Sequence, residues 1–322
     1  MTTIAVVGEV VADAVLPVGG IRGGAAHLTV HPGGGPANVA ITLARLGSTA
    51  RLAARLSDGS LGALCRDHLT ASGVDLSTSV AAVEPATLAI ARLADDGAAR
   101  YEFYVDGTAD WQWTDAELAP VLAGTPDVPV ALHTGSLALV LQPSGTAIEQ
   151  LLAAARATMT VSLDPNLRPS LVHPVQYRSR IDVWASLADI VRLSEDDLDL
   201  LWPGSTPEAA AARLHRAGVR LVVISLGAAG AFASLDGAHV RVPVAGTTVV
   251  DTVGAGDSFH GGLLHFLGNA GHLGGRLDTL TPDGVLEALE YAARVAAVTV
   301  SRAGADPPWA HELPPAPVGA KR

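Results

Sequence analysis

The sequence has almost no lysine or cysteine. Lys321 is its only lysine and stands one residue from the end, so a Schiff base, a Walker A phosphate clamp and a protein-kinase ion pair are improbable. Cys65 is its only cysteine, which excludes an internal disulfide and a cysteine-rich metal site. Any phosphate or metal chemistry must therefore rest on other side chains or on backbone groups.

The chain also lacks a basic excess and a long unbroken apolar run. It carries 21 basic against 32 acidic residues, a net charge of -11 that would repel a nucleic-acid backbone. A long uncharged stretch, residues 128–148, is interrupted by proline and glycine, so it does not predict a membrane span. The first apolar run has no basic residue before it and soon meets Glu9 and Asp13, unlike a signal peptide. We expect a cytoplasmic protein without nucleic-acid or membrane partners.

The sequence does contain short β-branched runs that alternate with segments of helical periodicity. The runs that predict strands are residues 3–7, 128–133, 159–164, 190–193 and 220–225. The segments that predict helices are residues 36–46, 61–72, 144–156, 195–201, 207–217 and 282–301. This alternation predicts an α/β fold, doubly wound, with a mainly parallel sheet covered on both faces.

Two regions depart from the alternation. Residues 88–93 and 100–105 read as strands joined by the turn signal 95–97, and the Gly-rich residues 19–31 would add strands to the same small sheet. We interpret these as a β lid, with strands within about 10–32 and 86–110 of a single domain that spans 1–322. A second hairpin, 231–235 with 239–243, is expected late in the chain, before a loose tail at 314–322.

The most informative stretch is Asp-Thr-Val-Gly-Ala-Gly-Asp-Ser-Phe-His-Gly-Gly at residues 251–262. The small side chains of Gly254, Ala255 and Gly256 leave the backbone open at the start of a predicted helix, where unpaired amides and the helix dipole attract anions. Asp257 follows in the first turn, in position to accept a proton from an attacking hydroxyl group. The alternative is a tight turn in which this aspartate only caps the helix.

A second stretch, His-Pro-Gly-Gly-Gly-Pro-Ala-Asn at residues 31–38, opens another predicted helix. Successive glycines expose backbone that a polyhydroxylated ligand can contact, and Asn38 offers donors and an acceptor in the first turn. Taken alone, a flexible loop before a surface helix explains this stretch equally well.

The two stretches together resemble the ribokinase-like (PfkB) carbohydrate kinases, which carry a Gly-Gly…Asn element early in the chain and a D-T-x-G-A-G-D element late. The resemblance spans nearly the whole chain. It implies a doubly wound α/β domain whose small β lid closes over the sugar, and transfer of the γ-phosphoryl group of ATP to a sugar hydroxyl with Mg²⁺.

The resemblance also assigns roles residue by residue. Asp257 becomes the catalytic base, and the amides of Gly254, Ala255 and Gly256 the anion hole. The residues that match the family's sugar contacts are Asp13, Gly34, Gly35 and Asn38. Asp164-Pro-Asn-Leu-Arg168 resembles the D-x-N-x-R element of fructokinases and 2-keto-3-deoxygluconate kinases, so Asn166 and Arg168 would reach the sugar or the phosphate from a strand end. A surface turn is the alternative for this element.

The nucleotide and metal elements match less closely. The family's N-x-x-E element, linked to Mg²⁺, falls on Ser194-Glu-Asp-Asp197, which makes Asp197 the metal candidate, with two acidic neighbours. The run Ser225-Leu-Gly-Ala-Ala-Gly230 resembles the nucleotide-binding loop, with Ser225, Gly227 and Gly230 as its candidate contacts. Asp251 and the backbone of 301–304 match the place where many relatives hold a monovalent cation, so K⁺ is a second candidate ion.

Rival functions fit less well. A dehydrogenase would need G-x-G-x-x-G after the first strand, and an α/β-hydrolase would need G-x-S-x-G; neither is present. Pro36 stands where ribokinases carry Gly-Gly-Lys-Gly, which favours a fructokinase. A 2-keto-3-deoxygluconate kinase, a ribokinase or another sugar or nucleoside kinase are the alternatives, and a non-catalytic sugar or nucleotide binder is the alternative from another class. The open lid edge predicts a homodimer.

Overall fold

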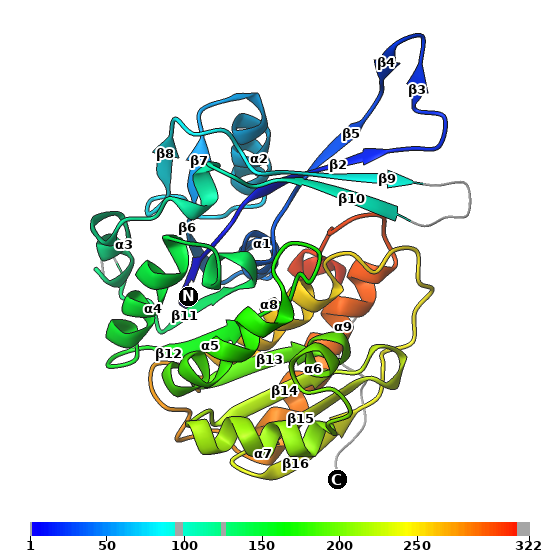
Figure 1. Cartoon of the computed structure of the whole chain (residues 1–322). Coiled ribbons are helices and arrows are strands. Elements are labelled where there is room, and N and C mark those ends of the chain that lie inside the picture. The colour runs from blue at the N-terminus through cyan, green and yellow to red at the C-terminus, as the bar shows by residue number, and fades with distance from the viewer. Residues whose placement is uncertain (1, 94–98, 124–126, 314–322) are drawn as a thin grey trace.

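The computed structural model describes residues 2–93, 99–123 and 127–313 (Figure 1). Its centre is an eight-stranded sheet in the order β16-β15-β14-β13-β12-β11-β1-β6. These strands are β16 (Ala238–Val242), β15 (Ala231–Leu235), β14 (Leu221–Ser225), β13 (Ile190–Ser194), β12 (Thr160–Asp164), β11 (Ala131–Gly135), β1 (Thr3–Val7) and β6 (Thr49–Ala53). From β6 to β14 all neighbours run parallel, so these strands end at a common edge.

Burial of both faces explains why the central strands read as continuous apolar runs. Every residue of β1, β11 and β12 is buried, as expected for parallel strands covered on both sides. The antiparallel hairpin β15–β16 extends one edge of the sheet, and its turn uses the positive φ of Asp236 and Gly237. The hairpin predicted at this point is therefore present.

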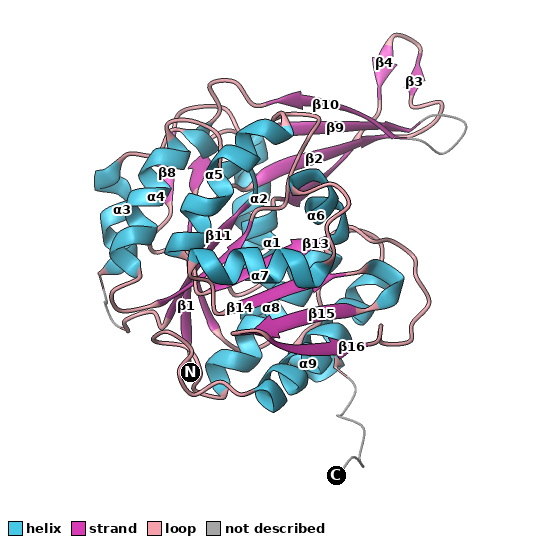
Figure 2. Cartoon of the chain, turned by 60° about the horizontal axis from the view of Figure 1, so that its bottom comes forward, coloured by secondary structure: helices cyan, strands magenta, loops and turns pink. Residues whose placement is uncertain are grey.

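Helices form a layer on each face of the sheet (Figure 2). The first layer contains α3 (Asp115–Leu122), α4 (Ser144–Ala155), α5 (Pro174–Leu187), α6 (Glu195–Leu201) and α7 (Pro207–Ala217). The second contains α1 (Gly35–Arg45), α2 (Ser60–Ala71), α8 (Ala255–Asn269) and α9 (Pro282–Val300). Each layer buries its own apolar cluster against the sheet, which confirms the doubly wound α/β class.

A smaller four-stranded sheet projects from the body (Figure 1). Its order is β10-β9-β2-β5, with β10 (Ala99–Tyr104), β9 (Leu88–Leu93), β2 (Val11–Leu16) and β5 (Thr29–Gly33). The hairpin strands expected near 88–93 and 100–105 are present, whereas the turn 95–97 and the tail 314–322 lie outside the described residues. The Gly-rich stretch 19–31 supplies only β5 to this sheet. Its remainder forms a separate pair, β3 (Ile21–Arg22) with β4 (Ala25–Ala26), which corrects the expectation.

Several elements differ from the sequence prediction. Strand β11 begins three residues later than expected, after Pro129, which has no N–H to give to a ladder. Helices α3 and α5 and strands β6, β7 (Arg55–Ser57) and β8 (Val80–Ala82) were not predicted. Among the described residues, no helix combines the length and the apolar character that a bilayer crossing requires.

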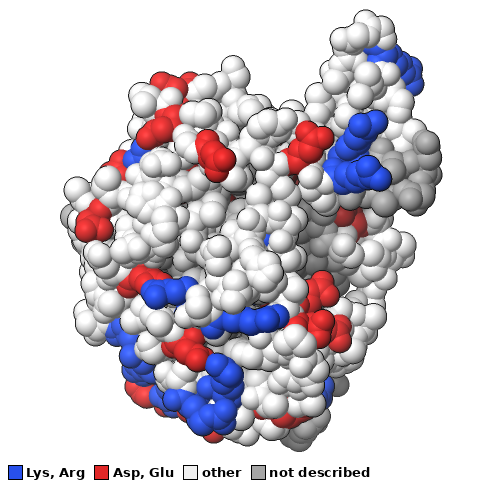
Figure 3. All heavy atoms as spheres, viewed as in Figure 1, with Lys and Arg blue, Asp and Glu red and all other residues white. Residues whose placement is uncertain are grey.

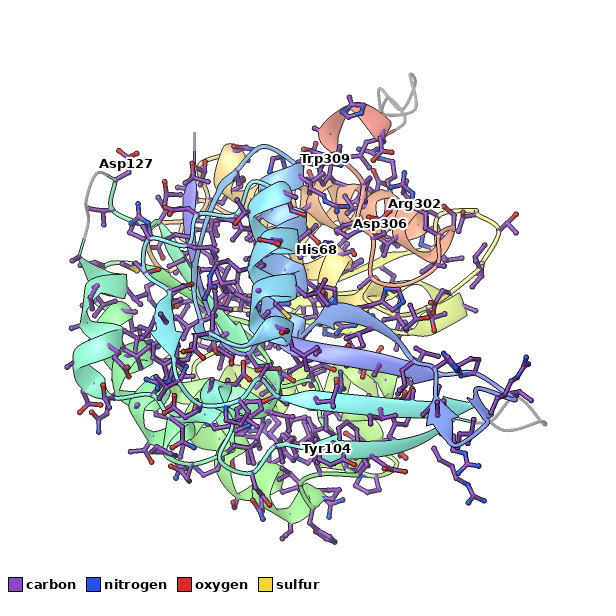
Figure 4. All side chains as sticks on the ribbon, turned by 90° about the horizontal axis from the view of Figure 1, so that it is seen from above. His68, Tyr104, Asp127, Arg302, Asp306 and Trp309 are labelled. Atoms are coloured by element: carbon purple, nitrogen blue, oxygen red, sulfur yellow. The ribbon has the colours of Figure 1, made fainter. Side chains whose placement is uncertain are left out.

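The C-terminal segment returns to the helices of the second layer (Figure 4). Arg45, at the end of α1, donates hydrogen bonds to Asp306 Oδ1 at 2.5 Å and to Pro307 O at 2.7 Å, and its guanidinium lies 5.3 Å from the ring centre of Trp309. These contacts hold Ala305 in place beside Gly254, just ahead of α8.

Candidate active site

The N-terminus of α8 is a turn that requires glycine. Gly254 precedes the helix with a φ of +73°, and a Cβ there would stand 2.5 Å from Ala305 Cβ. The amide of Ala255 donates to Thr252 O at 3.2 Å, whereas those of Gly254 and Gly256 have no backbone acceptor within the described ranges. The turn thus uses the Ala255 amide for its own hydrogen bond, whereas anion binding by the amides of Gly254 and Gly256 stays a prediction.

Asp257 stands in the first turn of α8, half-buried, and meets the other sequence motif. Its Oδ2 accepts a hydrogen bond of 2.8 Å from Asn38 Nδ2 on α1. Burial raises the pKa of Asp257 to about 6, and the negative charge of Asp164 acts in the same direction. The Asn38 hydrogen bond and the charges of Arg168 and Arg192 oppose this rise. Such a carboxylate is ionised at neutral pH and is still basic enough to take a proton from a hydroxyl group.

A pocket opens directly in front of Asp257. Its lining residues come from α1, the ends of β11 and β12, and α8: Gly35, Pro36, Val39, His133, Gly135, Ser136, Asp164, Asn166 and Asp257. A Cβ on Gly35 would stand 3.1 Å from Asn166 Nδ2 and 3.5 Å from Asp257 Oδ1, so a glycine keeps the space between these polar groups open. The pocket lies at the carboxyl ends of parallel strands, where open α/β sheets bind ligands.

Asp13 lies on β2 of the small sheet and is not among the residues that line the pocket. Burial raises its pKa to about 6, and the charges of Arg168 and His31 oppose the rise. Gly33 on the neighbouring strand β5, two residues beyond the Asp13 partner His31, has no side chain that would collide with the Asp13 carboxylate. Gly34 has a φ of +108°, and a Cβ there would stand 2.6 Å from Glu9 O. Gly34 is thus needed for the close backbone approach that delivers the chain into α1.

The predicted D-x-N-x-R element forms a turn at the end of β12. Asn166 adopts a φ of +41°, and its Oδ1 accepts a hydrogen bond of 2.6 Å from Arg168 Nη1. Asn166 lines the pocket, while Arg168 is exposed and influences both carboxylates, Asp13 and Asp257. The structure therefore brings Asn166 and Arg168 to the same side as the two predicted motifs.

The predicted nucleotide loop follows β14. Ser225 Oγ accepts a hydrogen bond from Arg192 Nη2, and Gly227 has a φ of +52° with open space around its α-carbon. A Cβ on Gly230 would collide with Val242 O of the β15–β16 hairpin. Packing within that hairpin is reason enough for Gly230, whereas nucleotide contacts at Ser225 and Gly227 stay predictions.

The two metal candidates differ in their surroundings. Both oxygens of Asp197 accept protein hydrogen bonds, Oδ1 from Leu167 N at 2.7 Å and Oδ2 from Ser194 N and Oγ at 2.9 and 2.6 Å. Burial raises the pKa of Asp197. Asp251 accepts from Gly304 N at 2.8 Å, so it does meet the 301–304 backbone. In the part of the chain that the structure describes, no three His, Cys, Asp or Glu residues gather to hold a metal ion.

The sequence reasoning missed a buried polar network beneath the pocket. Arg192 Nη1 donates to Asp164 Oδ2 at 2.9 Å, and His260 Nδ1 lies 3.7 Å from the same oxygen. Ser162 Oγ then bridges His260 Nε2 at 2.7 Å and His133 Nδ1 at 3.3 Å. The available signal was a charged residue inside the buried run Ile-Val-Arg-Leu-Ser of β13.

A helix that begins at a glycine turn, a half-buried carboxylate in its first turn and a small sheet projecting from a doubly wound domain are the features expected of a kinase of the ribokinase-like class. A family model described as pfkB family carbohydrate kinase matches residues 1–312. The chain belongs to this family and is a phosphotransferase.

Comparisons with individual proteins agree with this family. The chain is 39% identical over 235 residues to a fructokinase of Rhizobium leguminosarum bv. trifolii, covering 73% of this chain and 71% of that protein. Its fold is similar to that of Vibrio cholerae O395 fructokinase with fructose, ADP and calcium, with a TM-score of 0.79, 27% identity, and 95% and 94% of the two chains covered. It is also similar to Xylella fastidiosa fructokinase with bound ATP, with a TM-score of 0.82, 26% identity, and 94% and 93% covered.

Proposed function

We propose that this chain is an ATP-dependent fructokinase. The observation that carries the proposal is the hydrogen bond of 2.8 Å between Asn38 and Asp257. This hydrogen bond joins the Gly-rich stretch 31–38 to the turn at the start of α8. A sugar bound at the first and a phosphoryl group bound at the second would therefore meet at the Asp257 carboxylate. The similarity to fructokinases supports fructose as the acceptor.

Asp257 acts as the general base. The hydroxyl oxygen of the sugar forms a bond to the γ-phosphorus while the bond to the β–γ bridging oxygen breaks, and ADP leaves with that electron pair. The hydroxyl proton passes to an Asp257 carboxylate oxygen. The unpaired amides of Gly254 and Gly256 lie beside this carboxylate and stabilise the negative charge on the transferring group.

Sugar recognition comes from the pocket and the lid together. In this proposal the Asp13 carboxylate accepts hydrogen bonds from sugar hydroxyl groups, and the Asn38 amide can donate or accept them. Asn166, which lines the pocket, and Arg168, which donates to Asn166, are the further sugar or phosphate contacts. Gly34 and Gly35 expose backbone between them. Because Asp13 belongs to the projecting sheet, closure of this sheet would bring its carboxylate onto the sugar and exclude water.

The nucleotide lies along the loop after β14 in this proposal, with Ser225 and Gly227 near its phosphates. Mg²⁺ binds mainly through nucleotide phosphates and water, which fits a chain whose described acidic residues form no cage. Asp197 would act on Mg²⁺ through a water molecule rather than by direct coordination, because both of its carboxylate oxygens already accept protein hydrogen bonds. The Asp251–Gly304 contact supports a K⁺ site at this loop.

We further propose that the enzyme is a cytoplasmic homodimer that joins through the lid. The small sheet has two open edges, β5 and β10, and carries exposed apolar side chains on and beside it: Ile21, Leu28, Tyr101 and Tyr104. Figure 4 labels Tyr104, which lies at the end of β10. Acidic and basic side chains are mixed on the face seen in Figure 3, which supports a small-molecule enzyme rather than a nucleic-acid binder. Equilibrium sedimentation should give twice the chain mass.

The test of the function is ADP release measured with ATP, Mg²⁺ and a sugar panel of fructose, 2-keto-3-deoxygluconate, ribose and adenosine. Asp257→Asn should lower kcat by ~10² to 10⁴-fold with fructose, the usual worth of a positioned base. Asp283→Asn is the matched control, because Asp283 also stands in a first helical turn but is exposed on α9. Equal rates for native and Asp257→Asn proteins would refute the base assignment. Binding of fructose and ATP without turnover would instead favour a non-catalytic binder.

A further inference from the structure

Arg192 is a buried charge that no recognised motif of the chain includes. It stands in the middle of β13, and only 5% of its surface is exposed. Arginine is almost never fully buried without a specific role or partner. The surroundings of its guanidinium group therefore indicate what the charge is for.

The guanidinium lies directly behind the anion-binding turn. A Cβ on Gly256 would stand 2.7 Å from Arg192 Nη1 and 2.7 Å from Nη2. Both terminal nitrogens thus occupy the space that any side chain at position 256 would need. A side chain at position 256 would therefore displace the guanidinium, whereas glycine lets the positive charge lie against the backbone of the turn.

Two polar partners fix the orientation of the guanidinium. Nη1 donates to Asp164 Oδ2 at 2.9 Å, and Nη2 donates to Ser225 Oγ. The charges of Asp164, Asp197 and Asp257 all favour the protonated form, which raises the pKa of Arg192. Arg192 therefore connects the D-x-N-x-R turn, the predicted nucleotide loop and the catalytic helix.

We propose that Arg192 is a positioning residue for phosphoryl transfer, whose buried guanidinium, held by Asp164, supplies a fixed positive charge behind the Gly254–Gly256 turn and beside Asp257. The proposal rests on the kinase function proposed above. It gives this nearly lysine-free chain a permanent cation at the place where negative charge develops. Arginine suits the role because its planar fork is held in one orientation by two acceptors.

The charge has a consequence for the base. Three charged side chains act on Asp257: Arg192 on β13, Asp164 at the end of β12, and Arg168 in the loop after β12. His260 lies one turn further along the same helix as Asp257. Burial lowers the pKa of His260, so this imidazole is neutral near pH 7. The two arginines favour ionised Asp257 and Asp164 disfavours it. Loss of Arg192 therefore raises the pKa of Asp257. It also makes the electrostatic potential at the proposed anion hole less positive.

The experiment compares kcat, KM and the pH profile of native enzyme, Arg192→Met and Arg192→Lys with ATP and fructose. Arg192→Met should lower kcat at least about tenfold, less than the ~10³ to 10⁵ of an arginine that touches the phosphoryl group. It should also move the acid limb of the pH profile, which is the fall of kcat/KM at low pH, to higher pH. Arg192→Lys should return the limb to its native position. The matched control is Arg51→Met. Arg51 lies on the edge strand β6, is 3% exposed and forms an ion pair with Asp75.

A second variant separates charge from packing. Asp164→Asn removes a negative charge near Asp257, so it should move the acid limb to lower pH, opposite to Arg192→Met. A structural defect would not produce opposite shifts. The proposal is overturned if Arg192→Met keeps kcat within about twofold of native with an unmoved limb, or if Arg192→Lys fails to restore the limb. If Arg192→Met does not fold, the position of the acid limb in Arg192→Lys and Asp164→Asn still tests the proposal.

A readout without turnover keeps this proposal distinct from the kinase function. The carboxyl ¹³C signal of Asp257, assigned with Asp257→Asn, can be titrated in native and Arg192→Met proteins without substrate. A higher midpoint in Arg192→Met supports the proposed role of the charge, and an unchanged midpoint refutes it. A native chain that phosphorylates none of the sugars would instead refute the proposed function, whatever the titration shows.

Discussion

Gly254→Ala tests whether the anion-binding turn depends on a single missing methyl group. The alanine would have to keep a φ of +73°, which costs about 1–2 kcal/mol for a residue with a Cβ. Its Cβ would also stand 2.5 Å from Ala305 Cβ and 2.9 Å from Ala305 Cα, and such overpacking costs about 1–3 kcal/mol more. We expect a total loss of about 2–5 kcal/mol in the free energy of unfolding, measured by urea denaturation.

Gly271→Ala is the matched control for this variant. Gly271 has a φ of +76°, and no atom lies within 4 Å of the place its Cβ would occupy. It should therefore lose only the conformational part, about 1–2 kcal/mol. Adding Ala305→Gly to Gly254→Ala should recover part of the difference, since the Cα at position 305 stays close. Equal losses for Gly254→Ala and Gly271→Ala would refute the collision.

The same variants link the turn to catalysis. Relief of the collision has to move the turn, and its free amides then leave the position where the transferring group needs them. We expect Gly254→Ala to lose ~10² to 10³-fold in kcat, as for one lost donor of an anion hole. Gly271→Ala should keep the native kcat at a temperature where both variants are folded. A Gly254→Ala enzyme with native kcat would refute the anion-hole assignment.

Three further predictions concern titration, the sugar site and stability. Because burial raises the pKa of Asp257 to about 6 and the ionised form is active, kcat/KM should fall as pH drops through about 6, and Asn38→Ala should move this limb to higher pH. Asp13→Asn should raise the KM for fructose far more than that for ATP in initial-rate assays. Arg276→Met should cost about 3 kcal/mol in urea denaturation, since it leaves the fully buried Asp189 carboxylate unpaired.

Most of the fold could be predicted because the central strands carry their own signal. Their residues are mostly apolar and buried, and the helices between them have regular apolar spacing, so the predicted positions of these strands and helices lie within a few residues of the observed ones. Helix α5 was missed although Tyr177, Ile181 and Trp184 are spaced i, i+4, i+7 and buried. The three charged residues of α5, Arg178, Arg180 and Asp182, obscured that pattern. Strand β6 was missed because buried Arg51 interrupts it.

Some residues of the candidate site could also be predicted from the sequence, and others could not. Asp257 and Asn38 could be predicted because each lies in a short motif whose local geometry, a glycine turn before a helix, fixes where the side chain goes. Arg192 could not, because its position under Gly256 depends on the register of β12, β13 and β14 and on the packing of α8 across them. Such contacts join residues far apart in sequence, and a single sequence does not contain the register.

Because the chain has almost no lysine, the buried positive charge at the site is an arginine, and this affects how the site responds to pH. Arginine stays protonated over the whole range in which enzymes work, and the buried partners of Arg192 raise its pKa further. The positive charge behind the anion-binding turn therefore does not titrate, and burial lowers the pKa of His133 and His260, so that both imidazoles are neutral at pH 7. Burial raises the pKa of the Asp257 and Asp13 carboxyl groups to about 6, so both change charge just below neutrality. The fall of kcat/KM at low pH should therefore reflect Asp257 together with Asp13.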